Sequence, residues 1–272
     1  MSRVLVVGGT GLAGRAVTAE AIDRGHEVVV AARRVPDDDA PQYVNGAAYV
    51  TADLVTGEGL EEAVDGVDVI VDTSNAAGKQ AAHVFATGAQ NLVHTAARFG
   101  VHRAVLLSIV GVDRSAYRYY RAKAAQERAY LDSPLDARVV RSTQFHDFVT
   151  AIFDRGRPLG ALLTPTGTRF QPIAVGDVAR TLVDVADGAG QPGDIINVGG
   201  PTVESARSLA EQWKRGSGTR RFIMPVRLGG ALGATWRAGR NLAPEHAVGD
   251  GLGYGAWVSS AASATGPRGA AG

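Results

Sequence analysis

The sequence predicts an α/β fold in which a doubly wound parallel sheet carries helices on both faces, followed by a small C-terminal lobe. An apolar run at residues 4–7 leads directly into closely spaced glycines and then into apolar residues at helical spacing. Strands alternate with helices further on, which requires right-handed crossovers. Polar residues follow the carboxyl ends of several strands, where sheets of this kind bind ligands. The predicted class is therefore the Rossmann fold.

The composition narrows the classes of protein to which the chain can belong. It has 272 residues, of which 45% are hydrophobic and 20% charged, as is usual for a globular protein. The formal net charge of +1 gives no electrostatic reason to expect a nucleic-acid or membrane partner. The absence of cysteine excludes disulfides and thiolate catalysis. No apolar run is long enough to span a membrane and no signal segment precedes Val4, so we expect a cytoplasmic protein.

The predicted elements follow one another in regular order. Apolar runs predict strands at residues 4–7, 26–32, 47–54, 67–72, 103–109, 137–141 and 194–198. Amphipathic stretches predict helices at residues 12–24, 59–64, 80–99, 116–131, 177–186 and 203–213. Residues 216–225 and those after Leu228 predict irregular structure, and residues 259–272 predict a mobile tail. We expect one domain over residues 1–258, with its core at 1–145 and the lobe at 145–258.

The turn after the first strand carries the most specific motif of the chain. Gly8, Gly11 and Gly14 surround Thr10 and the first helical residue, Leu12. A tight turn needs residues without Cβ, a pyrophosphate needs bare backbone beside it, and a helix N-terminus offers free N–H groups to an anion. The pattern predicts a cradle for the phosphates of a dinucleotide, with a flexible glycine turn in another kind of α/β protein as the alternative.

The residues at the end of the second strand indicate which dinucleotide binds. Folds that prefer NAD place an acidic residue there, whereas this chain has Ala32, Arg33 and Arg34. A guanidinium pairs with the 2′-phosphate of NADP(H), so Arg33 and Arg34 favour NADP(H) and leave NAD(H) as the second choice. The alternative is that both arginines are only solvated surface residues. The acidic residues 37–39 also weaken the positive electrostatic field at this strand end.

Two further strand ends predict contacts with the cofactor. Asp53, next to Leu54, is placed to accept a hydrogen bond from the adenine amino group. Capping of the turn before Gly57 is an alternative of equal weight. After the fourth strand comes a polar cluster that is predicted to face the cofactor: Thr73, Ser74 and Asn75.

A tyrosine and a lysine on one helix form the predicted catalytic pair. Tyr119 and Lys123 are four residues apart and therefore share a helix face. A nearby ammonium lowers the pKa of a phenol, so that the tyrosine exchanges a proton with a substrate oxygen near neutral pH. Lys123 is also placed to hold the nicotinamide ribose, and Ser108 to bind the same substrate oxygen. The alternative is that Tyr119 only packs against its neighbours.

The histidines predict no metal site. All six are scattered without the spacing of metal ligands. His146 is the one that we place beside a pocket, with structural hydrogen bonding favoured over catalysis. Together with Gln144 and Phe145 it is predicted to contact the substrate.

These residues resemble the short-chain dehydrogenase/reductase superfamily, and most closely its atypical, NmrA-like NAD(P)-binding branch. The resemblance rests on GGTGLAG at residues 8–14, on Arg33, on Asp53 and on the pair Tyr119 and Lys123. It covers about residues 3–200 and implies a Rossmann domain with a C-terminal substrate lobe. Ser108 and Tyr119 are closer in sequence than in standard members, and members of this branch often lack the tyrosine. The resemblance therefore implies the fold and the cofactor more strongly than the catalysis.

The leading hypothesis is an NADPH-dependent reductase that transfers hydride to a carbonyl or quinone of an apolar, aromatic small molecule, with no flavin and no metal. The resemblance implies relatives in bacterial aromatic polyketide pathways. A polyketide-like quinone is then the expected acceptor, and reaction of its reduced form with oxygen would make the net outcome a monooxygenase-type hydroxylation. The alternatives are a non-catalytic redox sensor that binds the dinucleotide, and an isomerase or epimerase that recycles it. The sequence leaves a homo-oligomer open.

Overall fold

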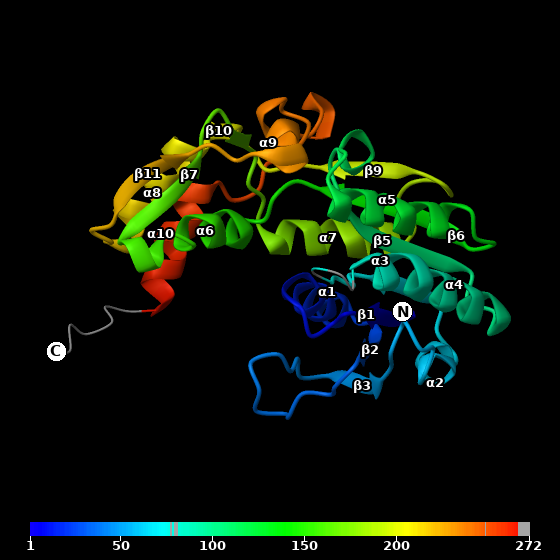
Figure 1. Ribbon diagram of the computed structural model, residues 1–272. Coiled ribbons are helices and arrows are strands. Elements are labelled where there is room, and N and C mark those ends of the chain that lie inside the picture. The colour runs from blue at the N-terminus through cyan, green and yellow to red at the C-terminus, as the bar shows by residue number, and fades with distance from the viewer. Residues whose placement is uncertain (77, 79–80, 248, 266–272) are drawn as a thin grey trace. The chain divides into compact units, whose positions relative to one another are not determined.

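Strand β1, Arg3–Val7, lies inside a seven-stranded parallel sheet (Figure 1). The computed structural model describes residues 1–76, 78, 81–247 and 249–265. The strands are arranged in the order β3-β2-β1-β4-β5-β6-β9. The remaining strands of this sheet are β2 (Glu27–Ala32), β3 (Ala47–Thr51), β4 (Val69–Asp72), β5 (Arg103–Ile109), β6 (Asp136–Ser142) and β9 (Ile195–Val198). The predicted doubly wound sheet is confirmed.

The strand order places a switch point between β1 and β4. From β1 the chain builds outward through β2 and β3, then crosses back to add β4 on the other side of β1. Val7 lies opposite Ala31 of β2 and opposite Asp72 of β4. The segments that follow these three residues therefore leave the sheet at the same edge, which is where ligands bind in open α/β sheets.

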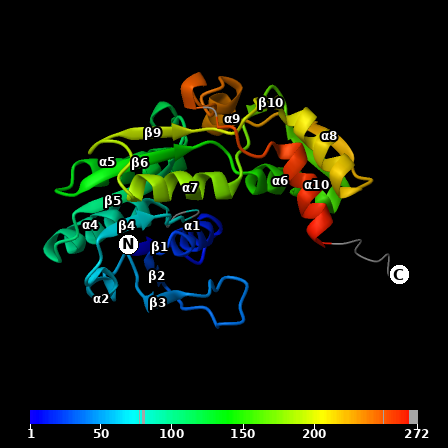
Figure 2. The same cartoon turned by 180° about the vertical axis from the view of Figure 1, so that it is seen from behind.

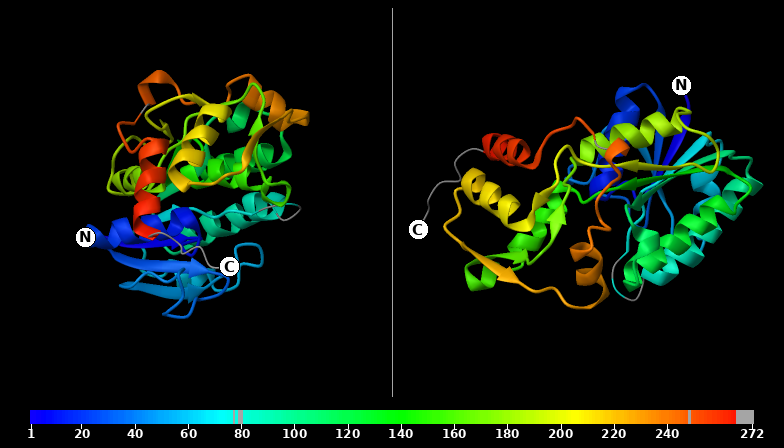
Figure 3. Two further views of the ribbon diagram at one scale, coloured as in Figure 1. Left: turned by 90° about the vertical axis from the view of Figure 1, so that its left-hand side faces the viewer. Right: turned by 90° about the horizontal axis from the view of Figure 1, so that it is seen from above.

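Helices cover both faces of the sheet, as the right-hand view of Figure 3 shows. Helices α1 (Leu12–Asp23) and α7 (Val175–Ala186) pack together on one face. Helices α2 (Leu60–Val64), α4 (Ala89–Arg98) and α5 (Arg118–Leu131) line the other, where Leu5 and Val7 join the core. Because Val4 and Val6 are buried on the opposite side, β1 is an uninterrupted apolar run.

The helix predicted at residues 80–99 is divided by a π-helical segment. It consists of the short helix α3 (Ala81–His83), the π-helical segment Val84–Gly88, and α4. Its predicted start at Gln80 lies outside the described residues. A π-helical segment accommodates one extra residue per turn, so apolar spacing alone does not distinguish it from the surrounding α-helix.

The chain divides into two compact units that differ from the predicted boundary near residue 145. The first unit contains residues 1–113, 118–141 and 175–197, and the second contains residues 114–117, 142–174 and 198–272. The difference arises because the chain returns to the sheet after residue 174 to add α7 and β9. The predicted core therefore lacked one helix and one strand of the first unit.

The second unit contains more regular structure than predicted. Strands β7 (Ala161–Pro165) and β11 (Phe222–Val226) form a parallel pair, and β8 (Arg169–Phe170) pairs with β10 (Glu204–Ser205). Helix α8 (Ala206–Ser217) packs on β7, and α10 (Tyr254–Thr265) lies along α8 (Figure 2). The other helices of this unit are α6 (His146–Asp154) and α9 (Gly230–Arg237), with 3₁₀ turns at 157–159 and 245–247.

The end of the chain also differs from the prediction. Residues 259–265, assigned to a mobile tail, belong to α10, and the rest of that predicted tail lies outside the described residues. A further 3₁₀ turn at Val112–Arg114 precedes α5. Among the described helices, none combines the length and the apolar character needed to cross a membrane.

Candidate functional site: a cavity at the switch point

The glycine turn after β1 is tightly packed, and its conformation requires glycine. Gly8 has a φ of +73°, and a Cβ added there would lie 3.0 Å from the Cα atom of Ser74. Gly11 donates its backbone N–H to the carbonyl oxygen of Gly8 over 3.0 Å. A Cβ on Gly14 would lie only 2.3 Å from that same oxygen. The turn and the first turn of α1 can therefore approach one another only because these positions lack side chains.

The amino end of α1 is available for an anion. Gly11 is its N-cap residue and provides no side-chain cap, and no acidic residue occupies the first turn. The first N–H groups of a helix have no partner within the helix and carry a partial positive charge. This end of α1 therefore has the features of a phosphate-binding helix terminus.

A cavity of about 630 Å³ opens beside this turn, at the carboxyl ends of β1 to β4. It brings together most residues that the sequence predicts as cofactor contacts: Gly8, Thr10, Gly11, Arg33, Asp53, Leu54, Thr73, Ser74 and Asn75. Among the described residues, its lining does not include four others that were predicted: Leu12, Gly14, Arg34 and Lys123. It does include several that were not predicted, among them Val55, Thr56, Ala76, His83 and Val84.

The turn at Asp53 forms one wall of the cavity. Oδ1 of Asp53 accepts hydrogen bonds from the backbone N–H groups of Val55 (2.7 Å) and Thr56 (3.2 Å). Asp53 therefore caps this turn, which is the alternative to an adenine contact, and the adenine contact remains a prediction. Nδ2 of Asn91 in α4 donates to the carbonyl oxygens of Leu54 (2.9 Å) and Val55 (3.1 Å). The wall is therefore fixed to α4, by a residue that the sequence did not single out.

A buried carboxylate fixes the opposite wall. Asp72, the last residue of β4, is fully buried, and its Oδ1 accepts the backbone N–H of Ser74 over 2.7 Å. Its Oδ2 accepts hydrogen bonds from Nε2 of Gln126 (2.9 Å) and from the phenol of Tyr130 (2.7 Å). Gln126 also donates to Oγ of Ser74 over 3.2 Å. Ser74, which lines the cavity, is thus held by α5 through a network that satisfies the carboxylate.

Lys123 lies directly behind this wall. Its side chain is buried, its Nζ donates to the carbonyl oxygen of Ser74 over 3.4 Å, and it lies 4.8 Å from the ring centroid of Phe85. Burial lowers the pKa of Lys123 from near 10.5 to about 8, although the negative charges of Asp72 and Glu127 oppose that shift. The lysine therefore contacts the backbone that shapes the cavity, not the cavity itself.

Tyr119 reaches the cavity wall one helical turn earlier in α5. Its phenol donates to Oδ1 of Asn75 over 2.8 Å, and its ring meets Phe85 edge-on at 5.5 Å. Ser108, in β5, is buried, and within the described part of the chain its Oγ has no hydrogen-bond partner. By strand alternation Ser108 shares a face with Leu106, the face covered by α4 and α5.

The three residues predicted to contact substrate form part of the framework of the second unit. Nε2 of Gln144 donates to the carbonyl oxygen of Asn241 over 2.9 Å, and Phe145 precedes α6 as its N-cap residue. His146 is fully buried, and its Nε2 lies 2.8 Å from the carbonyl oxygen of Leu252. This contact is the structural hydrogen bonding that the sequence favours for His146, and a substrate contact remains a prediction. His83, which the sequence did not single out, lines the cavity at the switch point.

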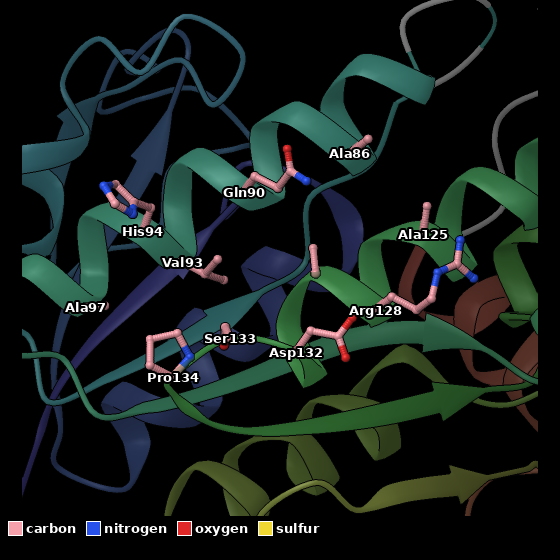
Figure 4. A pocket seen from close by; sticks show the side chains of 11 residues that line it. Ala86, Gln90, Val93, His94, Ala97, Ala125, Arg128, Asp132, Ser133 and Pro134 are labelled. Atoms are coloured by element: carbon pink, nitrogen blue, oxygen red, sulfur yellow. The ribbon is translucent and has the colours of Figure 1, made fainter.

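A second cavity, of about 580 Å³, lies between α4 and α5 (Figure 4). Its lining includes Gln90, His94, Arg128 and Asp132 together with several alanines, and none of the predicted site residues. It shares no lining residue with the cavity at the switch point. In the described part of the chain, no cluster of three or more metal-ligating side chains is found.

Comparison with known protein families agrees with the geometry of the switch-point cavity. Residues 8–189, which begin at Gly8 and end after α7, match the family described as NAD(P)H-binding. The chain belongs to the NAD(P)H-binding family. This confirms the resemblance to the NAD(P)-binding branch of the short-chain dehydrogenase/reductase superfamily.

Curated relatives match different shares of this chain. Divinyl chlorophyllide a 8-vinyl-reductase from Arabidopsis thaliana is 26% identical over 221 residues, which are 73% of this chain and 53% of the reductase. The photosystem II assembly factor Ycf39 from Synechocystis is 33% identical over 111 residues, which are 40% of this chain and 34% of that protein. The chain thus spans about half or less of the length of these relatives.

Solved structures of other proteins share the fold. A nucleoside-diphosphate-sugar epimerase from Staphylococcus aureus superposes with a TM-score of 0.72 at 18% identity, covering 94% of this chain and 99% of the epimerase. An NADPH-dependent quinone oxidoreductase from Escherichia coli, solved with NADPH, superposes with a TM-score of 0.69 at 20% identity, covering 83% and 78% of the two chains.

Proposed function

We propose that the protein is an NADPH-dependent reductase of a carbonyl or quinone carried by an apolar, aromatic small molecule. The observation that supports this best is the cavity at the switch point, where the glycine turn, the amino end of α1 and Arg33 come together. Membership of the NAD(P)H-binding family supports a dinucleotide as its ligand. The vinyl-reductase among the curated relatives supports a reduction as the reaction.

The preference for NADPH rests on the end of β2. Arg33 is exposed and lines the cavity directly after Ala32, where an acidic residue would favour NAD. Its guanidinium is proposed to pair with the 2′-phosphate. Arg34 is also exposed but is not among the residues lining this cavity, so we assign the contact to Arg33 alone.

Bound NADPH would supply the hydride. Tyr119 is proposed to deliver a proton to the substrate oxygen, since its phenol already reaches the wall at Asn75. The ammonium of Lys123, one turn away, would favour the ionised phenol after that transfer. A contact between Lys123 and the nicotinamide ribose requires the lysine to exchange its hydrogen bond with Ser74 for ribose hydroxyls. Ser108 is proposed to orient the same substrate oxygen.

The acceptor is proposed from the sequence as a polyketide-like quinone. The quinone oxidoreductase among the solved structures shares the fold that would hold it. Oxygen-dependent hydroxylation, a cytoplasmic location and a homo-oligomer remain predictions of the sequence.

Cofactor preference is tested with dissociation constants for NADPH and NADH on the wild type, on Arg33→Ala and on Arg34→Ala. A charge-assisted pair with phosphate stabilises by roughly 1.5–3 kcal/mol, so Arg33→Ala should weaken NADPH binding about 10- to 100-fold and change NADH binding little. Arg34→Ala is the matched control and should behave as the wild type. Tighter binding of NADH than of NADPH by the wild type would contradict the assignment.

Turnover is tested separately, by NADPH consumption with a panel of quinones, aldehydes and ketones, in air and under nitrogen. Lys123→Ala and Tyr119→Phe should lower kcat while both still bind NADPH. Tight NADPH binding without consumption by any acceptor would favour the redox sensor. Conversion of a sugar nucleotide to its isomer without net NADPH consumption would favour the epimerase.

A further inference from the structure

The two units differ strongly in charge. The first unit contains 15 Lys and Arg against 21 Asp and Glu, a formal charge of −6. The second contains 13 Lys and Arg against 6 Asp and Glu, a formal charge of +7. The net charge of +1 is therefore the sum of two large and opposite values. It conceals a unit basic enough to attract an anionic surface.

Six cations of the second unit gather where its parallel strand pair begins. Because β7 and β11 are parallel and Ala161 lies opposite Phe222, both strands start at the same end of the unit. The segment between α6 and β7 therefore meets the last turn of α8 and the segment that joins α8 to β11. We call this the basic end; its cations are Arg155, Arg157, Lys214, Arg215, Arg220 and Arg221.

Acidic side chains neutralise little of the positive charge at the basic end. Asp154 is the acidic residue here, and it pairs with Arg221 at 2.6 Å. Within the described part of the chain, no ion pair engages the other five cations. By contrast Arg207, at the start of α8, pairs with Glu211 at 3.1 Å. The positive charge of the basic end is therefore available to an external partner.

Two large apolar side chains protrude at the same place. Leu159 is 64% exposed and Phe222 is 54% exposed, and among the large hydrophobic side chains of the described residues Met1 alone is more exposed. They are neighbours, because the backbone N–H of Phe222 donates to the carbonyl oxygen of Gly160 over 3.2 Å. Exposed apolar side chains that adjoin one another indicate an interaction site more strongly than isolated ones.

We propose that the basic end, with Leu159 and Phe222 at its tip, docks on the surface of an anionic lipid bilayer. Its cations would face lipid phosphates, while the two apolar side chains would enter the boundary between headgroups and acyl chains. Nucleic acid fits less well, because of the two apolar side chains Phe222 alone offers a ring on which a base can stack, whereas the more exposed Leu159 is aliphatic. This partner is independent of the reductase activity proposed above.

The proposal is tested by co-sedimentation of the full chain with vesicles. Vesicles of mixed phosphatidylglycerol and phosphatidylcholine are compared with vesicles of phosphatidylcholine alone, at low and at high salt. The wild type should bind the anionic vesicles, and high salt should weaken that binding. Arg157→Glu combined with Arg215→Glu should weaken it at least about 100-fold, since each basic residue near an anionic surface contributes about fivefold and its reversal more. Leu159→Ser combined with Phe222→Ser should weaken it about tenfold or more.

Matched controls lie elsewhere in the second unit. Arg227→Glu reverses an exposed arginine just beyond the opposite end of β11, and Val203→Ser removes an exposed apolar side chain. Both should bind vesicles as the wild type does. Urea denaturation of every variant, measured beside the wild type, confirms that each one folds.

Three results would overturn the proposal. The wild type could fail to bind anionic vesicles at low salt, or Arg227→Glu could weaken binding as much as the paired reversal. Binding to single-stranded DNA that the paired reversal abolishes, and that the serine variants leave intact, would instead assign the basic end to nucleic acid.

Discussion

The phenol of Tyr130 donates a 2.7 Å hydrogen bond to the buried carboxylate of Asp72, and so connects α5 to the end of β4. The other oxygen of that carboxylate fixes the backbone of Ser74, which lines the cavity. A side chain deep in the core of the first unit therefore helps to set the shape of the cavity at the switch point. Burial, and then the charge of Asp72, raises the pKa of Tyr130 well above its usual range, so that it remains a donor.

Removal of that donor should destabilise the first unit. Tyr130→Phe keeps the ring but leaves the buried carboxylate with one hydrogen bond fewer, which should lower the free energy of unfolding by about 1–3 kcal/mol. Urea denaturation measures this change. Tyr43→Phe, at a half-buried tyrosine stacked on Tyr49, is the control and should cost little. Equal effects of the two substitutions would argue against a special role for the bond to Asp72.

Lys123 should give the protein a particular dependence on pH. Its pKa is about 8 in the folded protein and near 10.5 when unfolded, so between these values the unfolded state binds more protons. Stability contributed by this group therefore rises with pH across that window, by roughly 3 kcal/mol in all. Urea denaturation at several pH values should show the wild type gaining this amount relative to Lys123→Met. Parallel pH profiles for the two proteins would contradict the lowered pKa.

Gly14→Ala should damage both the fold and cofactor binding. The new Cβ would press on backbone atoms of Gly8 and Gly9, which cannot rotate away as a side chain can. We expect a loss of about 1–3 kcal/mol in stability, and weaker binding of NADPH because α1 is displaced from the turn. Gly176→Ala is the matched control in the first turn of α7, where the nearest atom lies 3.9 Å away. It should be neutral or slightly stabilising, as measured by the same denaturation and binding experiments.

Asn91 should act on the cofactor site without touching it. Asn91→Ala removes the two hydrogen bonds that fix the turn at Leu54 and Val55 to α4. We expect a loss of about 1–3 kcal/mol in stability and a several-fold weaker affinity for NADPH. His94→Ala, at an exposed residue one turn further along α4, is the comparison and should change neither quantity. A normal NADPH affinity in Asn91→Ala would show that the cavity wall at Leu54 and Val55 keeps its shape without the hydrogen bonds from Asn91.

Local sequence patterns predicted the sheet and its glycine turn well. Val4–Val7 is apolar on both faces because helices cover both sides of β1, and Gly8 and Gly14 have no room for a side chain. Arg33, Asp53 and Ser74 follow the strand ends and line the cavity, as parallel strands require. These features depend on short stretches of chain, which sequence patterns describe directly.

Features that depend on distant contacts were not predicted. The sequence predicts Asp72 only as the last residue of a strand. Its role in the site was not predicted because its partners Gln126 and Tyr130 lie more than 50 positions away in sequence. The burial of His146 follows in the same way from its contact with Leu252, 106 positions later. Nor could a net charge of +1 indicate the basic end, because that patch arises only when two separate segments meet beside β7 and β11.

The first unit is not continuous in sequence, and this affects how it can form during synthesis. Helix α7 packs against α1, β4 and β5, yet the ribosome makes it only after residues 142–174, which belong to the other unit. The apolar face that α7 covers must therefore remain uncovered while those residues are translated, which is a period of exposure to chaperones and to aggregation. A fragment that stops near residue 145 would retain the glycine turn after β1 but keep that face permanently open to water.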